Sequence, residues 1–241
     1  MSTARPLAGR LALVTGASRG IGAAVARRLA LSGARVALLA RSADALSALV
    51  EDIGDGAVAL VCDVRDTGAL GRALDSLPEL LGGAPGIVVN NAGAFFVAPA
   101  RDTSVDAFAA TLAVNLTAPF AVVRALLPAM LASREGHVVT IGSIADRMAF
   151  PGNAAYAASK YGLRALHEVL RAELKATGVR VSLVSPGPVN TDLWNAIDPD
   201  QQAGFTPRSD MLSPESVADA VHWVVTSPAG VNVDELRLSR S

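Results

Sequence analysis

Short apolar runs alternate along the chain with longer amphipathic stretches. Apolar runs bounded by Gly, Pro, Asn or charged residues are typical of buried parallel strands, and they cover residues 11–15, 35–40, 57–62, 86–89, 137–141, 179–184 and 231–238. Apolar positions three and four apart predict helices over residues 23–32, 43–53, 67–81, 105–133, 153–177 and from 213 onward. This alternation predicts an α/β fold with a parallel sheet and helices on both faces.

One long segment, residues 192–212, follows neither period. It mixes Trp194, Phe205 and Met211 with Pro and Gly. A long irregular segment in a compact domain is more often a lid over a site than a linker. We therefore expect one domain over residues 1–241 with a substrate lid at 192–212.

Composition narrows the classes of partner. The net charge is −1 and the basic residues do not cluster, so no nucleic-acid surface is expected. The apolar runs are broken before a membrane-spanning length, and the run after Arg5 and Arg10 is too short for a signal peptide. We expect a cytoplasmic protein with a small-molecule substrate and no membrane partner.

The metal-binding and redox residues are few. The single cysteine, Cys62, lies in an apolar strand-like run and is expected in the core. The three histidines, His137, His167 and His222, share no metal-ligand spacing, so we expect structural or surface roles and no metal site.

A glycine-rich loop separates the first strand from the first helix. Glycines allow a tight turn and a close backbone approach, and the helix N-terminus that follows favours an anion. A structural turn is the alternative, but the strand-loop-helix context favours a dinucleotide phosphate. The residues expected to contact it are Gly16, Ser18, Arg19, Gly20, Ile21 and Gly22.

The end of the second strand indicates which dinucleotide is bound. An NAD enzyme often places an acid there for the ribose hydroxyl, whereas this chain has Ala40 and Arg41, with no acid before Asp44. Arg41 and Arg19 would flank a 2′-phosphate, with Ser42 as a further donor and helix N-cap. The alternative is solvated surface arginine. The pattern predicts NADP(H) rather than NAD.

Further candidate ligand contacts follow the other strands, at the carboxyl edge where open α/β sheets bind ligands. A purely structural turn is the alternative for the Asn-rich segment 90–93, whose amides can tie strand ends together. The expected contacts are Asp63, Val64, Asn91, Ala92, Gly93, Pro186, Gly187, Val189 and Thr191.

Asn115 interrupts the apolar character of the long helix, and Pro119 follows four residues later. Proline has no N–H, so the Asn115 carbonyl loses its usual partner. A buried carbonyl without a partner needs water or a ligand. The spacing predicts a kinked helix with a hydrated carbonyl, with an ordinary surface kink as the alternative.

Tyr156 and Lys160 stand four apart at the start of a predicted helix, on one face of it. An ammonium about 4 Å from a phenol contributes roughly 4 kcal/mol at an effective dielectric of about 20, which would lower the phenol pKa by up to about 3 units before desolvation. Ser143, after the fifth strand, would place a hydroxyl on the same reacting oxygen. The alternative is a tyrosine packed on a lysine stem.

Together these motifs resemble the short-chain dehydrogenase/reductase family over nearly the whole chain. The matching segments, in order, are residues 15–22, Asp63, residues 90–93, Asn115, Ser143, Tyr156-x-x-x-Lys160 and residues 186–191. The resemblance implies a single-domain, doubly wound Rossmann fold with a parallel seven-stranded sheet in the order 3-2-1-4-5-6-7. It also implies NADP(H) as the cofactor, and a reaction between a ketone or aldehyde and the matching alcohol. The three-residue gap between Tyr156 and Lys160 implies C=O rather than C=C reduction.

The resemblance also implies roles for the site residues. Tyr156 would be the general acid/base, and Lys160 would lower its pKa and hold the nicotinamide ribose. Ser143 would orient the carbonyl oxygen, and Asn115 would hold a relay water through its main-chain carbonyl. Two helices, 105–133 and 153–177, are apolar over more than one stripe, so a homotetramer or homodimer is expected.

Three questions stay open at this level. Asp146 stands where the family often has a small residue, and Arg147 follows it; the two form either a surface ion pair or part of the entrance of a pocket for a polar substrate. Phe95, Phe150 and Trp194 are candidate walls for an apolar substrate. The alternative functions are a non-catalytic NADP-sensing protein and a reductase of carrier-bound 3-oxoacyl chains.

Overall fold

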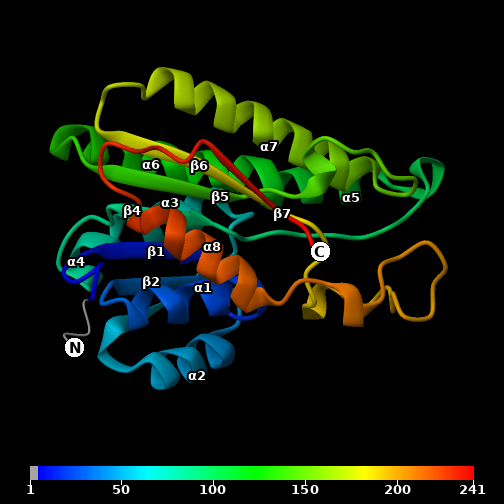
Figure 1. Ribbon diagram of the computed structural model, residues 1–241, viewed down its shortest axis with the longest axis horizontal. Coiled ribbons are helices and arrows are strands. Elements are labelled where there is room, and N and C mark those ends of the chain that lie inside the picture. Colours follow the sequence, from blue (N-terminus) through cyan, green and yellow to red (C-terminus); the bar gives the residue numbers. More distant parts are fainter. Residues whose placement is uncertain (1–4) are drawn as a thin grey trace.

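The computed structural model describes residues 5–241 and is built on a seven-stranded parallel sheet (Figure 1). Its order, β3-β2-β1-β4-β5-β6-β7, is the predicted order. The strands are β1 (Leu11–Thr15), β2 (Arg35–Ala40), β3 (Ala57–Val61), β4 (Ile87–Asn90), β5 (Gly136–Ile141), β6 (Val179–Pro186) and β7 (Glu235–Leu238).

Eight α-helices accompany the described strands. They are α1 (Gly20–Leu31), α2 (Ala43–Ile53), α3 (Thr67–Asp75), α4 (Leu77–Leu81), α5 (Val105–Leu112), α6 (Ala118–Ser133), α7 (Ala154–Glu173) and α8 (Pro214–Thr226). The single helix predicted over 67–81 is instead two, divided at Ser76, because Pro78 lacks the N–H that would continue the first helix. The last strand begins at Glu235 rather than at Val231, where the chain still turns.

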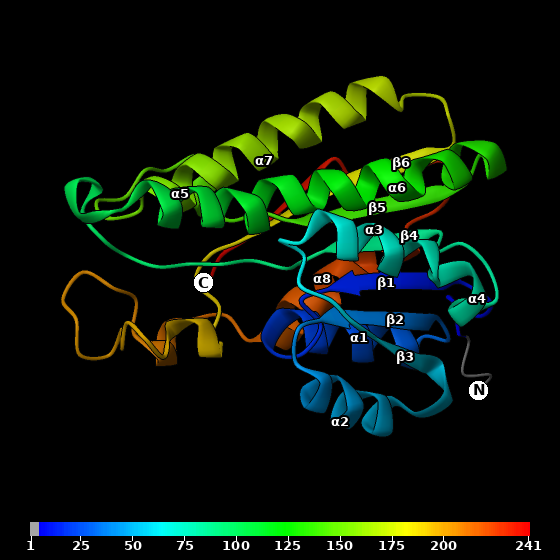
Figure 2. The ribbon, with the colours of Figure 1, turned by 180° about the vertical axis from the view of Figure 1, so that it is seen from behind.

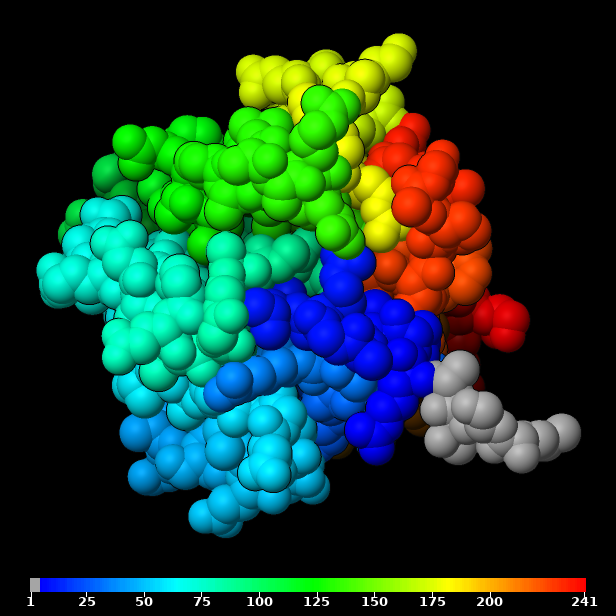
Figure 3. All heavy atoms as spheres, turned by 90° about the vertical axis from the view of Figure 1, so that its left-hand side faces the viewer, coloured from blue at the N-terminus to red at the C-terminus, as the bar shows by residue number. Residues whose placement is uncertain are grey.

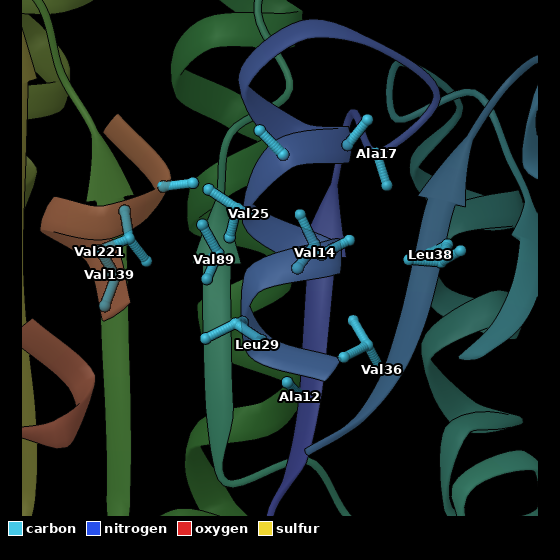
Figure 4. Packing of buried hydrophobic residues seen from close by; sticks show 14 of the residues in the cluster. Ala12, Val14, Ala17, Val25, Leu29, Val36, Leu38, Val89, Val139 and Val221 are labelled. Carbon is cyan, nitrogen blue, oxygen red and sulfur yellow. The ribbon is translucent and has the colours of Figure 1, made fainter. Parts of the chain in front are cut away.

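The helices cover both faces of the sheet (Figures 1 and 2). One buried cluster joins α1, α2 and α8 to the sheet, and the other joins α3, α4, α6 and α7 to the opposite face. Alternate residues of β1 divide between them, since Ala12 and Val14 belong to the first cluster and Leu13 to the second. Figure 4 shows Val25 and Leu29 of α1 packed over β1 and its neighbours. A strand buried on both faces is therefore continuously apolar, as its sequence is.

The continuous helical run from Val105 to Ser133 departs from two expectations. By length and composition it could cross a membrane, with a mean hydropathy of 1.6 in its most apolar window, although the sequence analysis expected no such run. It lies against the sheet and α7 and buries Val122, Val123 and Met130. The single helix predicted over 105–133 is also divided by a π-helical turn, Ala113–Thr117, and Phe120 of α6 is exposed.

The amino and carboxyl ends of the strands lie on opposite sides of the molecule. Figure 3 views the side at the left of Figure 1, where the first described residues lie beside chain from the middle and the end of the sequence. Arg10 pairs there with Glu135 at 2.8 Å. The irregular segment 192–212 projects at the opposite side, beyond the carboxyl ends of the strands (Figures 1 and 2).

Candidate active site

A cavity of about 1610 Å³ follows the carboxyl ends of the strands. The loops after β1, β2, β3, β4, β5 and β6 all contribute to its lining. Every residue expected to bind cofactor or to act in catalysis lines it except Gly22 and Asn115. The structure therefore gathers residues from the whole length of the chain at one site.

The glycine-rich loop has the conformation that its sequence predicts. Gly16 and Gly20 have φ of +66° and +55°, a region that favours glycine. A Cβ on Gly16 would lie 2.8 Å from the Ala92 Cα, so the loop packs on the segment after β4. Gly22 lies beneath this contact, where a Cβ would meet the Asn91 amide at 2.5 Å. Gly22 therefore allows close packing of the loop rather than lining the cavity.

Asn91 joins the loop after β4 to the loop after β1. Its side-chain amide donates to the carbonyl oxygens of Thr15 at 2.9 Å and Gly16 at 3.2 Å. The Thr15 hydroxyl in turn accepts from the backbone N–H groups of Asn91 at 3.1 Å and Ala92 at 3.0 Å. The structural interpretation of this amide is thus confirmed, and Asn91 also borders the cavity.

Three arginines line the cavity where the 2′-phosphate was expected, and the sequence analysis identified only two. Arg41 and Arg19 were expected; Arg65 was not. The Arg65 guanidinium contacts the Asp63 carboxylate at 2.6 Å, and this hydrogen bond lowers the pKa of Asp63. Arg19 lies 4.0 Å from Asp192, toward the irregular segment. The missed signal was position: Arg65 lies in the loop after β3, a strand that ends at the ligand edge.

Asn115 lies in a π-helical turn, Ala113–Thr117, between α5 and α6. Its side chain is fully buried; Oδ1 accepts from the Ala94 N–H at 2.7 Å, and Nδ2 donates to the Ala94 carbonyl and the Ser159 hydroxyl, each at 2.9 Å. The helix thus departs from α geometry at the position that Pro119 indicated. The side-chain role was not foreseen, and the hydrated main-chain carbonyl stays a prediction.

The catalytic candidates meet at one end of the cavity. Ser143 follows β5 and its hydroxyl accepts from the Ala145 N–H at 3.1 Å. Tyr156 and Lys160 come from the first turns of α7. The Lys160 ammonium donates to the Ile141 carbonyl at 2.9 Å and lies 5.7 Å from the Tyr156 ring centroid. The predicted shared face of the helix is confirmed.

The electrostatics at Tyr156 differ from the sequence argument. Burial raises the pKa of Tyr156, the Ser143 hydroxyl acts in the opposite direction, and the charge of Asp146 raises it further. The net pKa of Tyr156 is therefore raised rather than lowered, because burial, which the sequence argument left out, outweighs the effects that favour the phenolate. Burial lowers the pKa of Lys160 itself to about 8, against the charge of Asp146.

Aromatic side chains form one wall beside Tyr156. Phe95 meets the Tyr156 ring edge-on at 4.8 Å between centroids and meets Trp194 at 5.1 Å. Trp194 continues to Phe205 at 6.2 Å and donates its indole N–H to the Val189 carbonyl at 3.0 Å. Phe150 also lines the cavity. The irregular segment is thus joined to the site through aromatic contacts.

The sequence favoured a surface ion pair for Asp146, but its carboxylate is buried. Asp146 is 2 % exposed, and Ser185 donates to its carboxylate at 2.7 Å. Arg147, at 3.6 Å, also pairs with Glu235 of β7. The burial could not be read from the sequence, because it depends on β6 and β7 lying beside the turn.

No group of His, Cys, Asp and Glu side chains within residues 5–241 is arranged to hold a metal ion. His137 is buried in β5, its Nε2 lies 2.8 Å from the Ser182 hydroxyl, and burial lowers its pKa to about 3. His167 is buried and burial lowers its pKa to about 4. His137 and His167 therefore have structural positions.

Comparison with known proteins gives one consistent family. A family profile described as short chain dehydrogenase matches residues 10–202. An NADP-dependent 3-hydroxy acid dehydrogenase of Salmonella typhi is 33% identical over 233 residues, 95% of this chain and 94% of its own. A glycine betaine reductase of Emericella nidulans is 38% identical over 238 residues, 96% of this chain but 19% of that much longer protein.

A solved structure carries the same architecture. The closed form of serine dehydrogenase, complexed with NADP⁺, superposes with a TM-score of 0.87 at 33% identity, over 95% of this chain and 94% of that one.

Proposed function

The chain belongs to the short-chain dehydrogenase family, and from its site we propose an NADP(H)-dependent oxidoreductase that interconverts a ketone or aldehyde with the matching alcohol. The observation that carries the proposal is the meeting of Ser143, Tyr156 and Lys160 at one end of the cavity whose other parts are the glycine loop and the arginines. A reacting carbonyl and a dinucleotide would thus share one enclosed site. Sequence position alone does not require this convergence.

The lining of the cavity fits a phosphorylated dinucleotide. Gly16, Gly20 and Ile21 place the glycine loop and the start of α1 at the cavity wall, and a helix N-terminus suits a pyrophosphate. Arg41 and Arg65 suit a 2′-phosphate by charge-assisted hydrogen bonds. Val64, Ala92, Gly93, Pro186, Gly187, Val189 and Thr191 complete the proposed lining. When bound, NADPH supplies the hydride.

Two side chains of α7, Tyr156 and Lys160, would carry out the proton transfer. Because burial raises its pKa, the Tyr156 phenol stays protonated at neutral pH and donates its proton to the alkoxide as the carbonyl is reduced. Lys160, with a pKa of about 8, is mostly an ammonium at pH 7, so it stabilises the phenolate left behind. Ser143 donates to the same substrate oxygen and orients it.

The Asn115 side chain acts as a brace for this arrangement. It binds Ala94, next to the candidate substrate wall, and Ser159, which precedes Lys160. We propose that the main-chain carbonyl of Asn115 holds the water of a proton relay, as the family resemblance implies.

The substrate would lie against Phe95 and Trp194, under a lid formed by residues 192–212. The apolar character of this wall supports an apolar or aromatic substituent on the reacting carbon. The lid is fastened by the Trp194 indole and by its aromatic neighbours rather than by a covalent link. We propose that it opens for exchange of substrate and cofactor.

The direct test is NADPH oxidation with a panel of aromatic and aliphatic ketones, aldehydes and carrier-bound 3-oxoacyl chains, with the matching alcohols and NADP⁺ in the reverse direction. We expect turnover with free ketones or aldehydes. Turnover confined to carrier-bound chains would replace this proposal with the acyl-chain alternative. Tight NADPH binding without any turnover would support the NADP-sensing alternative.

Two broader features belong to the proposal. The exposed apolar side chains on α5, α6 and α7, Val105, Phe120, Tyr161 and Val169, support association into a homotetramer or a homodimer. A cytoplasmic location suits a reaction that draws on reduced cofactor and a chain whose cysteine, Cys62, is a buried free thiol. Cell fractionation tests the location.

A further inference from the structure

A carboxylate lies buried beneath the loop that presents Ser143. Asp146 ends the short turn Ile144–Asp146 directly after Ser143, and its residue is 2 % exposed. Its Oδ2 accepts a hydrogen bond from the Ser185 hydroxyl at 2.7 Å, and its Oδ1 lies 3.6 Å from the Arg147 guanidinium. The Ser185–Asp146 bond therefore joins the loop after β5 to the end of β6.

Gly142 shows how closely this bond lies under the catalytic loop. A Cβ on Gly142 would lie 3.0 Å from the Asp146 carboxylate and nearer still to the Ser185 hydroxyl. The space of a side chain at position 142 is thus filled by the hydrogen-bonded pair. Because Gly142 immediately precedes Ser143, the pair fixes the backbone from which the Ser143 hydroxyl projects.

The Asp146 carboxylate also lies near the start of α7, because the Lys160 ammonium donates to the Ile141 carbonyl at 2.9 Å and the adjacent Gly142 packs against this carboxylate. Its charge therefore acts on α7. It raises the pKa of Tyr156 and, against burial, the pKa of Lys160. The only cation within ion-pairing distance of this carboxylate in residues 5–241, Arg147, is a third exposed and shared with Glu235. A buried negative charge whose nearest cation is shared and partly in solvent keeps most of its field.

The other charged groups around it are held by their own partners. Arg164 of α7 donates to the Asp146 main-chain carbonyl at 3.4 Å and pairs with Glu168. His167 of α7 is buried, with a pKa lowered to about 4, so it is neutral near pH 7. Glu235 of β7 faces Arg147. None of these replaces Asp146 as the charge acting on Lys160.

We propose that Asp146 is a positioning residue of this active site, holding Ser143 through its hydrogen bond with Ser185 and stabilising the Lys160 ammonium through its negative charge. The inference rests on the proposed function for its kinetic readout. It assigns a role to the one position where the sequence departs from the family's small residue.

The sign of the effect follows from the charge. Carbonyl reduction needs the Tyr156 proton and the Lys160 ammonium, so the rate falls as pH rises through their pKa values. Removing a negative charge lowers both pKa values. Loss of the Asp146 charge therefore moves the alkaline fall in kcat to lower pH.

The kinetic test compares Asp146→Asn with the parent across pH in NADPH-dependent reduction. The amide keeps the shape and still accepts from Ser185, so the expected change is an alkaline midpoint lower by at least about half a pH unit. Glu168→Gln, which removes a carboxylate on the far side of Arg164, is the matched control and should keep the parent midpoint. An Asp146→Asn profile that coincides with the parent profile overturns the electrostatic role.

Ser185→Ala tests the positioning role separately. It removes the hydrogen bond but leaves the carboxylate charge, so we expect a loss in kcat of roughly tenfold with the alkaline midpoint unchanged. An unchanged kcat overturns the positioning role. If Asp146→Asn does not fold, Asp146→Ser removes the same charge with a smaller side chain.

A second readout needs neither substrate nor cofactor. The chain has two tyrosines, so Tyr161→Phe leaves Tyr156 as its only phenol. In that background, the phenolate absorbance should appear at lower pH with Asp146→Asn than with Asp146. Identical titrations would refute the inference even if no substrate were found, whereas a shift without turnover would count against the proposed function alone.

Discussion

At the scale of single residues, burial decides the protonation states at the site. Tyr156 is protonated because its environment disfavours the phenolate, and Lys160 is near its titration point for the same reason. The phenol therefore starts as a protonated acid, and a nearby positive charge is needed to stabilise the phenolate that it leaves. In the proposed reaction, this asymmetry would favour proton donation, and so carbonyl reduction, at neutral pH.

We predict that Tyr156→Phe removes most turnover and leaves NADPH affinity nearly intact, because the ring still packs on Phe95 but has no proton to give. A positioned proton donor contributes typically ~10²–10⁴-fold. Steady-state rates and NADPH fluorescence titration measure the two effects. A variant that keeps a third or more of the parent rate would exclude the assignment. Lys160→Ala should lose both rate and cofactor affinity.

We predict that NADPH is preferred over NADH by at least about tenfold, since one charge-assisted hydrogen bond contributes roughly 1.5–3 kcal/mol. Ala40→Asp with Arg41→Ala should reverse the preference while the catalytic residues stay unchanged. Arg27→Ala, an arginine paired with Asp52 outside the cavity, is the control. Comparable kcat/KM for both cofactors in the parent would contradict this prediction and leave Arg41 as surface charge.

At the scale of elements, the segment 192–212 and the pairing of β5 with β6 carry the main consequences. Aromatic contacts at Phe95 and Phe205, and the indole hydrogen bond, hold the segment at the site through Trp194. His137 and Ser182 are both fully buried between β5 and β6. The first contact bears on substrate binding and the second on folding stability.

Trp194→Ala should raise KM for an apolar ketone by roughly tenfold, because burying a large apolar side chain is worth about 1.5–3 kcal/mol, and leave the NADPH Kd unchanged. Trp223→Ala is the matched control, since the second tryptophan is exposed on α8 and does not line the cavity. An unchanged KM in the Trp194 variant would remove the lid from the substrate site.

The buried His137 makes folding sensitive to acid. Its pKa is about 3 when folded against an ordinary value of 6.5, so below pH 6.5 the unfolded chain binds the extra proton. The contribution of neutral His137 to the free energy of unfolding is complete above that pH. It is lost as pH falls toward 3, by up to roughly 1.4 kcal/mol per pH unit. Urea unfolding at several pH values should show a smaller acid loss in His137→Gln. An equal loss would locate the acid sensitivity elsewhere.

At the scale of the whole molecule, several large apolar side chains are exposed on helices of the sheet face opposite α1 (Figure 2). Val105 is 82 % exposed and Phe120 is 48 % exposed, on two parts of one helical run, with Tyr161 and Val169 on α7. Large apolar side chains gathered in this way are typical of an association surface. A two-fold contact between copies would bury them.

Sedimentation at micromolar concentration should therefore give a homotetramer or a homodimer. Phe120→Glu should shift the distribution to smaller species, because a charge would be buried at the contact. Leu31→Glu, at an exposed position at the end of α1, should not. A parent chain that sediments as a monomer would exclude the association.

The sequence by itself determined the sheet, its order and most of the residues around the cavity. Strand segments such as residues 36–40 are apolar throughout because both faces are covered, and the glycines at 16 and 20 are required by positive φ. These are local constraints, so they are legible in the chain. The Tyr156–Lys160 pair is local too, since one helix face carries both residues.

Only the tertiary structure decided the pKa values of the site residues and the hydrogen bonds that these residues make to distant segments. Asp146 is buried because β6 and β7 lie beside its turn, and Lys160 turns to the Ile141 carbonyl rather than serving the phenol alone. Asn115 binds Ala94 through its side chain, a contact between segments that the sequence separates. Desolvation and long-range hydrogen bonds depend on which segments meet in space, and residue spacing along the chain does not contain that information.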